Sequence, residues 1–379
     1  MMEDRLVSNI RVGLDRAGID ANIDLQWSRP FIAVDEGQIA RATEVASETF
    51  GVVSASPSLC ISRDRDEIVS TVAEVATETY ERGTFAVRAR RADKRLPYTS
   101  GDLEREAGSA VFEAVQGQFD PEVDLDDPDI TFHIEVRREH AYVFTDIVAG
   151  VGGLPVGTQA PMVALISGGI DSPVAAYRIM RRGSPIIPVY VDLGTYGGAD
   201  HQARALEAIA RLHSYAGAQR EPAYIVPAGD IIERFVAEVD AGRMLLLRRF
   251  MFMIAEHIAR DVGAVGIVTG EALGQKSSQT ATNFEVTGMA TELPIHRPLL
   301  TMDKVEITDI ARDIGTFRSS TVPTGCPTIA PDRVMTKASV ADIDQLEPDD
   351  FDQLTEMVVE RAEVLEPTNL SPYAKLSPG

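Results

Sequence analysis

The sequence predicts an α/β protein whose larger part is a doubly wound parallel sheet and whose first part is α+β. From residue 161 onward, short apolar runs alternate with segments of helical periodicity, and glycine-containing turns separate them. Alternation of this kind is typical of parallel sheets with helices on both faces. Before residue 150, helical and strand-like segments do not repeat so regularly. We therefore expect ligands to bind at the carboxyl ends of the parallel strands.

The first part of the chain predicts two small α+β modules. Residues 1–45 predict a helix and then one or two short strands. Residues 46–150 predict helices over 68–81 and 103–119 and strands over 84–90, 130–137 and 141–149. Residues 150–157 are rich in glycine and no helix begins after them, so we interpret them as a hinge or linker.

The second part predicts the strands and helices of the parallel sheet. Apolar runs predict strands over 162–166, 186–191, 223–226 and 264–269, and helices are expected over 173–182, 201–216, 231–239 and 244–261. Residues 340–379 are acidic, and we expect helices there, followed by a frayed tail of proline and serine.

The composition is strongly acidic. The formal net charge is −22, and the chain has thirty-one arginines against five lysines. The acidic residues are scattered along the chain, which we interpret as adaptation to a very salty cytoplasm. The net charge then indicates adaptation to salt, and only local clusters of arginine indicate a binding partner. No apolar run is long enough to span a membrane, and the N-terminal helix contains acidic residues, unlike a signal peptide, so we expect a cytoplasmic protein.

The chain has two cysteines, Cys60 and Cys326. Two thiols are too few for a four-thiolate zinc site or an iron–sulfur cluster within one chain. Cys60 lies in a strand-like stretch, where we expect a small, buried apolar residue.

The segment from Met162 to Pro173 predicts a phosphate site. A buried strand runs into Ser-Gly-Gly-Ile-Asp-Ser, and a helix is expected to begin with Ser172 as its N-cap and Pro173 at the first helical position. The glycines let backbone N–H groups approach an anion, and the helix N-terminus adds a partial positive charge. The Gly-Lys-Ser/Thr of a Walker loop is missing, so transfer of a γ-phosphate is not the expected reaction.

The Ser-Gly-Gly-Ile-Asp-Ser segment resembles the signature of the pyrophosphate-loop ATPases, which cleave ATP between its α and β phosphates. Further segments narrow the family: Gly-Glu-Ala-Leu-Gly-Gln-Lys-Ser-Ser-Gln-Thr at 270–280, Arg-Pro-Leu-Leu-Thr-Met-Asp-Lys at 297–304, Ile-Gly-Thr at 314–316, and Cys326. With residues 153–159, and with a 46–150 module that looks like a THUMP domain, they closely resemble the 4-thiouridine tRNA sulfurtransferase family, ThiI.

The resemblance implies an enzyme that binds ATP with Mg²⁺, adenylates the uridine at position eight of tRNA and replaces its O4 with sulfur. It implies that Asp171 and Lys304 support adenylation, because a carboxylate can hold Mg²⁺ and a fixed ammonium can neutralise charge on the α-phosphate. The residues implied to bind ATP are Leu165, Ile166, Ser167, Gly168, Gly169, Ser172, Arg248, Gly270 and Gln279.

The same resemblance divides the chain into four parts. These are a partial N-terminal ferredoxin-like module at 1–45, a THUMP domain at 46–150, an adenylation domain at 151–345, and a C-terminal helix and tail at 346–379. The chain begins at the first helix of the ferredoxin-like module, and it ends at Gly379 without the rhodanese domain of many relatives. The relatives also lead us to expect a homodimer.

Cys326 matches the cysteine of the family's catalytic domain, and the resemblance implies that it takes part in sulfur transfer. The C-x-x-C pair of some relatives is missing, since the second position is Ile329. The sulfur donor is therefore open between an external persulfide carrier and sulfide, and Cys326 either carries a persulfide or resolves one. A role in making the thiazole ring of thiamine stays open as well.

A cluster of basic residues in the second module indicates an RNA contact. On the strand expected at 84–90, apolar side chains share one face and arginines share the other. The THUMP resemblance implies that this cluster binds tRNA; its members are Arg88, Arg90, Arg91, Lys94 and Arg95. The alternative is that these arginines are solvated and paired with local acids.

Two other functions stay open. One is a pyrophosphate-loop ligase or amidotransferase that acts on a small molecule and needs no RNA. The other is a THUMP-bearing RNA-binding protein without catalysis, against which the intact Ser-Gly-Gly-Ile-Asp-Ser segment and Lys304 argue.

Overall fold

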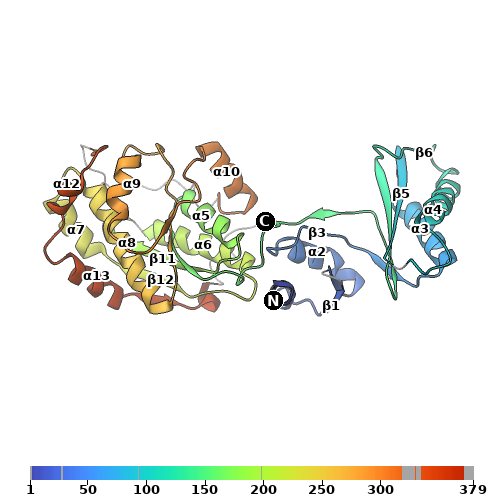
Figure 1. Cartoon of the computed structure of the whole chain (residues 1–379), viewed down its shortest axis with the longest axis horizontal. Helices are drawn as coiled ribbons and strands as arrows, with labels where there is room; N and C mark the ends of the chain where they lie inside the picture. Colours follow the sequence, from blue (N-terminus) through green and yellow to red (C-terminus); the bar gives the residue numbers. More distant parts are fainter. Residues whose placement is uncertain are drawn as a thin grey trace. The chain divides into compact units, whose positions relative to one another are not determined.

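The computed structural model describes residues 2–26, 29–92, 94–197, 199–317, 329 and 334–370 (Figure 1). The chain divides into two compact units. Unit 1 comprises the residues up to 34, residues 48–53 and the residues from 150 onward. Unit 2 comprises residues 35–47 and 54–149. The chain therefore enters and leaves unit 2 twice.

Unit 2 is built on a five-stranded sheet with the strand order β4-β8-β7-β5-β6. The strands are β4 (Leu59–Ile61), β5 (Thr84–Arg91), β6 (Glu122–Val123), β7 (Ile130–Val136) and β8 (Ala141–Phe144). β5 is parallel to β6 and β7, whereas β7–β8 and β8–β4 are antiparallel pairs. Helices α3 (Arg65–Thr79) and α4 (Ser100–Val115) lie side by side against this sheet (Figure 1). The predicted α+β module is confirmed.

Both helices that lie against this sheet begin at side-chain caps. Asp64 accepts hydrogen bonds from two backbone N–H groups at the start of α3, and Thr99 forms a capping box with Asp102 at the start of α4. Each cap satisfies N–H groups that have no partner inside the helix. Unit 2 also contains η1 (Glu36–Gln38), α2 (Ile39–Ser47) and the short pair of β3 (Ser54–Ala55) with β9 (Val148–Ala149).

Unit 1 contains a six-stranded sheet with the strand order β14-β13-β10-β11-β12-β15. The strands are β10 (Met162–Leu165), β11 (Ile186–Asp192), β12 (Ala223–Pro227), β13 (Ile267–Val268), β14 (Ile295–His296) and β15 (Glu363–Leu365). All pairs are parallel except β12–β15. The predicted doubly wound parallel sheet is confirmed. Sequence reasoning missed β14 and β15, which have only two and three residues, whereas the equally short β13 lies within the longer apolar run at 264–269.

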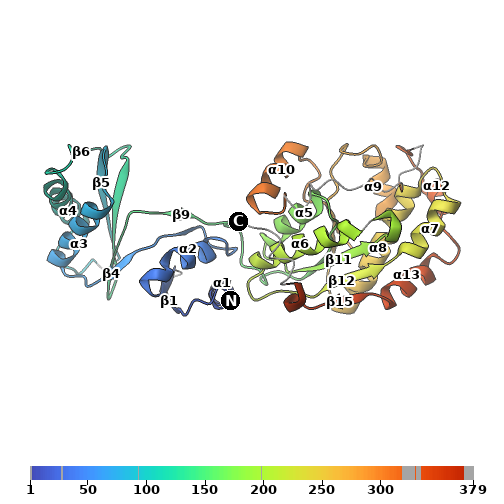
Figure 2. The same cartoon turned by 180° about the vertical axis from the view of Figure 1, so that it is seen from behind.

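Helices cover both faces of this sheet (Figure 2). On one face lie α5 (Asp171–Met180), α6 (Ala199–Tyr215) and α10 (Lys304–Asp313), and on the other lie α7 (Gly229–Glu238), α8 (Arg243–Val262) and α13 (Phe351–Glu360). Neighbouring residues of a strand enter opposite cores, as Val163 and Ala164 do. Unit 1 also contains α1 (Met2–Arg16), β1 (Asn22–Gln26), β2 (Arg29–Ala33), η2 (Gly194–Tyr196), α9 (Ala281–Gly288), α12 (Val340–Asp344) and η3 (Pro367–Leu370).

The N-terminal helix α1 is fixed to unit 1 by a buried amide. The side chain of Asn9 is 1% exposed. Its Nδ2 donates to the carbonyl of Val156 at 3.0 Å, and its Oδ1 accepts from the N–H of Ala218 at 3.1 Å. A buried amide with both ends paired costs little, whereas losing one partner leaves a buried polar group unsatisfied. Asn9 therefore fixes the position of α1 along the body of unit 1.

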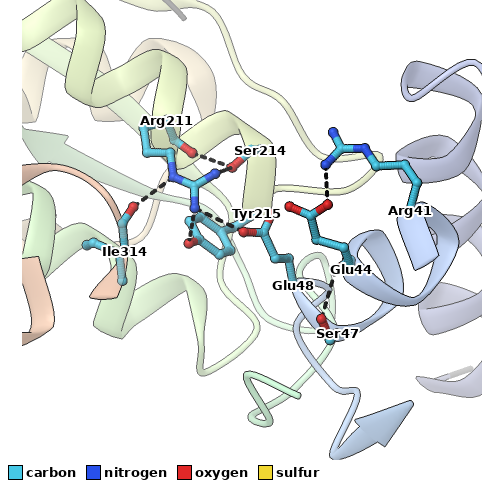
Figure 3. A network of polar contacts seen from close by, with 8 residues as sticks. All are labelled: Arg41, Glu44, Ser47, Glu48, Arg211, Ser214, Tyr215 and Ile314. Carbon is cyan, nitrogen blue, oxygen red and sulfur yellow. Dashed lines mark hydrogen bonds and ion pairs between the residues drawn. The ribbon is translucent and has the colours of Figure 1, made fainter. Parts of the chain in front are cut away.

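Arg211 of α6 joins three parts of unit 1 (Figure 3). Its Nε donates to the carbonyl of Ile314 at 2.7 Å, just after α10, and its Nη2 donates to Glu48 Oε1 at 3.0 Å. The same Nη2 donates to the Tyr215 hydroxyl at 2.7 Å, and the guanidinium lies 4.7 Å from the centroid of that ring. Arg211 thereby ties the end of α10 and the 48–53 segment to α6.

The glycine-rich segment at 150–157 begins where the chain leaves unit 2, and it is bonded on both sides to other segments of unit 1. Its role as a hinge or linker stays a prediction. The N–H of Gly152 donates to the carbonyl of Val52 at 2.8 Å, and the N–H of Leu154 donates to the carbonyl of Arg181 at 2.9 Å. Gly153 has φ +81°, and a Cβ atom there would lie 2.2 Å from the Arg181 carbonyl oxygen. Glycine is needed here for close backbone approach rather than for flexibility.

Cys60 is exposed, so the expectation that it is buried is wrong. It lies on β4, a three-residue strand at the edge of the unit 2 sheet. Its neighbour across the pair is Tyr142 of β8. A side chain on an edge strand has a neighbouring strand on one side only, so it can stay exposed. The apolar residues around Cys60 do not indicate that its strand lies at an edge. Within the described ranges, no helix is both long enough and apolar enough to cross a membrane.

We expect Gly153→Ala to lower the free energy of unfolding by about 3 kcal/mol or more, because the new Cβ adds a backbone overlap to the strain of a positive φ. The matched control is Gly18→Ala, whose φ is +71° with no atom within 4 Å of the added Cβ. That variant should lose only about 1–2 kcal/mol. Denaturant unfolding in molar salt measures both, and equal losses would contradict the packing argument.

We expect His213 to make stability depend on pH. Its side chain is 2% exposed, and burial, with repulsion from Arg220 and Arg16, lowers its pKa to about 3. In the unfolded chain the pKa is about 6.5, so the unfolded state takes up the proton first as pH falls. The free energy of unfolding should therefore drop between pH 6.5 and 3, by up to about 1.4 kcal/mol per pH unit.

Unfolding curves between pH 4 and pH 7 for the wild type and His213→Leu measure this contribution. Carboxylates titrate alike in both proteins and cancel in the comparison. The leucine variant should show the shallower dependence, and parallel pH curves would contradict the assignment.

Candidate functional site

The Ser-Gly-Gly-Ile-Asp-Ser segment connects β10 to α5 at the carboxyl end of the parallel sheet. α5 begins at Asp171, and Ile170 is its N-cap without a side-chain cap bond. The prediction that Ser172 is the N-cap is therefore wrong. Instead, Ser172 lies inside the helix, and its Oγ accepts from the N–H of Ser167 at 2.8 Å and lies 3.0 Å from Ser167 Oγ. The two serines thus hold the loop closed on itself.

Glycines allow three backbone segments to meet at this loop. A Cβ at Gly168 would lie 2.8 Å from the carbonyl oxygen of His201 on α6. A Cβ at Gly270 would lie 2.6 Å from the backbone nitrogen of Ser172. At Gly169 it would meet only Ser167 Oγ, at 3.4 Å. Gly168 and Gly270 therefore pack the loop against its neighbours. The N–H of Gly169 donates to Ser167 Oγ at 3.3 Å, and the missing side chain leaves space for a ligand beside the loop.

Asp171 joins three elements at the start of α5. Its Oδ1 accepts from Lys304 Nζ at 2.6 Å, and its Oδ2 accepts from Gln275 Nε2 at 3.2 Å. Lys304 is the first residue of α10, whose N-terminus is fixed by a capping box of Asp303 with Glu306. Sequence reasoning paired Asp171 with Lys304 but missed Gln275. The polar 270–280 segment was the available signal, although nothing in it singles out Gln275.

A buried carboxylate holds two arginines beside the site. Glu271 is 2% exposed, and it accepts hydrogen bonds from Arg248 of α8 and from Arg297 Nε, the latter at 2.8 Å. Arg297 also lies over the ring of Phe284, 4.8 Å from its centroid. Two cations on one carboxylate leave a net positive charge in a partly buried place. Sequence reasoning named Arg248 and missed both Glu271 and Arg297.

The side chain of Gln279 offers an unused acceptor. Gln279 is 7% exposed, and its Oε1 is buried without a hydrogen-bond partner. A buried acceptor of this kind fits a ligand that brings a donor, such as an amino group or a hydroxyl. Ile166 is buried and Leu165 half-buried at the end of β10, on the same edge of the sheet. These residues can form the apolar wall of a nucleotide site.

The predicted basic cluster lies in unit 2 and is only partly free. Arg88 and Arg90 are exposed on β5, on the face opposite Phe85 and Val87, and Lys94 and Arg95 are exposed just beyond the strand. Arg88 donates to the carbonyl of Leu125. Arg91 is half-buried and donates to the carbonyls of Leu96 and Tyr98. Arg91 therefore stabilises the loop after β5, while Arg90 and Lys94 are exposed to solvent, where an anion can reach them.

Two further expectations concern Cys326 and a metal ion. Cys326 falls outside the described residues. Within the described ranges, no group of three or more His, Cys, Asp or Glu side chains is arranged to hold a metal ion.

Comparison with known proteins finds one family model for each of the two main parts of the chain. The family model described as thiamine biosynthesis protein (ThiI) matches residues 157–350, and the model of the THUMP domain matches residues 62–146. A relative from Halobacterium salinarum named "Probable tRNA sulfurtransferase" is 49% identical over 348 residues, 92% of this chain and 88% of its own. A relative of the same name from Methanosarcina acetivorans is 40% identical over 341 residues, 89% of this chain and 82% of its own.

A solved structure is also similar over nearly the whole length. It is a 4-thiouridine synthetase–RNA complex with bound ATP, and it superposes with a TM-score of 0.87 at 30% identity. The similarity covers 96% of this chain and 95% of that one.

Proposed function

The chain belongs to the ThiI family of tRNA sulfurtransferases, and we propose that its site adenylates the uridine at position eight of tRNA before sulfur replaces O4. The observation that carries this proposal is the Asp171–Lys304 ion pair beside the Ser167–Ser172 loop. A phosphate cradle without a Walker lysine, next to a fixed ammonium, suits attack at the α-phosphate of ATP.

We propose that ATP binds with its phosphates at the loop and its adenine toward the end of β10. The space beside Gly169 and the N-terminus of α5 would receive the pyrophosphate part. Leu165 and Ile166 would contact the nucleotide, and the unpaired Oε1 of Gln279 would accept from it. Arg248, held by Glu271, would supply positive charge. Gly270 acts by leaving room for the loop.

Lys304 is the residue that we expect to act on the reacting atoms. As uracil O4 attacks the α-phosphate, negative charge builds on the phosphate oxygens, and a fixed ammonium stabilises that charge. Asp171 holds the ammonium in place at 2.6 Å. We propose that Mg²⁺ enters with ATP and is bound mainly by its phosphates, and that Asp171 would be a protein carboxylate that helps to hold it, because Mg²⁺ commonly uses only one or two protein carboxylates.

We propose that tRNA binds through the THUMP-like region at 46–150, using the exposed members of the basic cluster, Arg88, Arg90, Lys94 and Arg95. Residues 1–45 would form the partial ferredoxin-like module, 151–345 the adenylation domain, and 346–379 the C-terminal helix and tail. For sulfur, we propose an external persulfide carrier, from which the Cys326 thiolate takes the outer sulfur as the carrier's thiol leaves, or whose disulfide with the base it resolves. Sulfide, as the alternative donor, would attack the adenylated base directly, displace AMP and need no persulfide on Cys326.

We expect ATP to be cleaved to AMP and pyrophosphate only when tRNA is present. Asp171→Ala and Lys304→Ala should each lower the rate of tRNA adenylation by roughly 100-fold or more, because each loses a positioned charge. Their tRNA affinity should stay close to that of the wild type. Pyrophosphate release and filter binding measure the two quantities.

The matched controls are Asp352→Ala and Lys337→Ala, which change exposed residues of the same types. Both should adenylate tRNA at the wild-type rate. Release of ADP as the stoichiometric product, or near-normal rates in Asp171→Ala and Lys304→Ala, would overturn the proposed function.

We expect Cys326→Ser to form adenylated tRNA but no 4-thiouridine with a persulfide donor, because adenylation precedes the step that needs a thiol. Excess sulfide may be tested as a bypass, since a small nucleophile can attack the adenylated base directly. Cys60→Ser is the matched control, and because Cys60 is exposed it should keep both activity and stability. Mass analysis of the tRNA product decides, and normal thiolation by Cys326→Ser would show that this cysteine is not required.

A further inference from the structure

Gln275 lies in the site without a role in the proposed chemistry. Its Nε2 donates to Asp171 Oδ2 at 3.2 Å. The orientation of the amide follows from this bond, because a carboxylate oxygen accepts only from the NH₂ end. The other end, Oε1, is buried and has no hydrogen-bond partner. Gln275 is therefore half satisfied, with a free acceptor beside the residue that holds Lys304.

The loop that carries Gln275 is fixed by its own backbone bonds. The N–H of Leu273 donates to the carbonyl of Leu300 at 3.0 Å, and the N–H of Gly274 donates to the carbonyl of Gln279 at 2.8 Å. The N–H of Gln279 donates in turn to the carbonyl of Lys276 at 2.8 Å. The free oxygen thus belongs to a side chain held at both its backbone and its amide nitrogen.

An acceptor in this state is unfavourable in the empty protein. A buried polar atom without a partner loses its hydration and gains nothing in return. Oε1 is closed to bulk solvent and has no partner among the described residues. Such groups in a folded protein call for an explanation, and a ligand that brings a donor is one.

Asp171 presents two different hydrogen-bonding groups from its two oxygens. Lys304 on Oδ1 is a donor, and Gln275 on Oδ2 offers the free acceptor. The two oxygens of a carboxylate are neighbours, so the ammonium and the amide lie close together. Uracil carries the complementary pair on two atoms that are both bonded to C4, since O4 is an acceptor and N3–H is a donor. Cytosine carries the reverse pair, an amino donor at position 4 and an acceptor at N3, and mismatches both groups.

We propose that Gln275 selects uracil by accepting a hydrogen bond from N3–H of the target base while Lys304 faces O4. This inference rests on the proposed function, since it takes the target base to be uracil. Because Oε1 is covered in the empty site, the base reaches it only after a small movement of the atoms over the oxygen. Asp171 then sets the specificity of the site as well as its charge, because it orients both groups.

The test measures RNA affinity in the presence of the α,β-methylene analogue of ATP, so that adenylation cannot proceed. Four tRNAs differ only at the target position: uridine, 3-methyluridine, cytidine and 5-methyluridine. The first and last keep N3–H, and the methyl group of the last controls for added bulk. The wild type should bind the 3-methyluridine tRNA at least about tenfold more weakly than the 5-methyluridine tRNA, as expected for a lost hydrogen bond that leaves a buried acceptor unpaired.

The decisive quantity is the ratio of the affinities for the 5-methyluridine and 3-methyluridine tRNAs, compared between the wild type and its variants. In Gln275→Met and Gln275→Ala the ratio should shrink by about tenfold, because the acceptor is gone. Effects of the modified base on the RNA itself are the same with every protein and cancel. Gln345→Met, the same substitution at an exposed position, should keep the wild-type ratio. Thermal unfolding confirms that each variant is folded.

An unchanged ratio in both Gln275 variants would overturn the proposal. So would a tenfold loss of affinity for the ATP analogue with base discrimination intact, because the oxygen would then serve the nucleotide. The proposed function is tested separately by pyrophosphate release from ATP with native tRNA and wild-type protein. Release there, together with an unchanged ratio, overturns the role of Gln275 alone.

Discussion

The carboxylate of Asp171 is the point on which the arrangement of the site depends. One oxygen holds Lys304 at the start of α10, and the other holds Gln275 in the loop after β13. These elements follow different strands and meet because the carboxyl ends of parallel strands share one edge of the sheet. Close packing then locks the arrangement, since Gly270 lies against the backbone of Ser172 and Gly168 against α6. A larger side chain at either glycine would separate the parts that Asp171 joins.

Arginine serves several purposes in this acidic chain, which limits what a count of basic residues says about RNA. Arg243 is 9% exposed, and its guanidinium donates to the backbone carbonyls of Val239, Val236 and Ile329. The guanidinium of Arg211 donates to the carbonyl of Ile314 at the end of α10 and to Glu48. A planar group with five donors is suited to satisfying several carbonyls at once. Only arginines that keep free, exposed donors, such as Arg90, can be counted toward a phosphate-binding surface.

The sequence was sufficient for the sheet class and for the residue types at the site, and it failed where tertiary contacts decide. Short, continuous apolar runs between the helical segments predicted β10 to β13, since a strand buried on both faces is apolar along its length. Ser172 has the chemistry of an N-cap, but its hydroxyl bonds to Ser167 because the loop folds back on it. Gln275 and Glu271 could not be recognised, because their roles come from partners far along the chain. The glycines of residues 150–157 suggested backbone flexibility, whereas Gly153 is needed because the backbone of Arg181 approaches it closely.

The connectivity of the two units has a consequence for how the protein forms during synthesis. Asn9 bonds to Val156 and Ala218, which are 147 and 209 residues away. Phe50, fully buried, packs against the rings of Tyr177 and Tyr215. When α1 and the 48–53 segment leave the ribosome, none of these partners yet exists. All residues of unit 2 precede residue 150, so it can fold first, and contacts of such long sequence separation make unit 1 the slower to form.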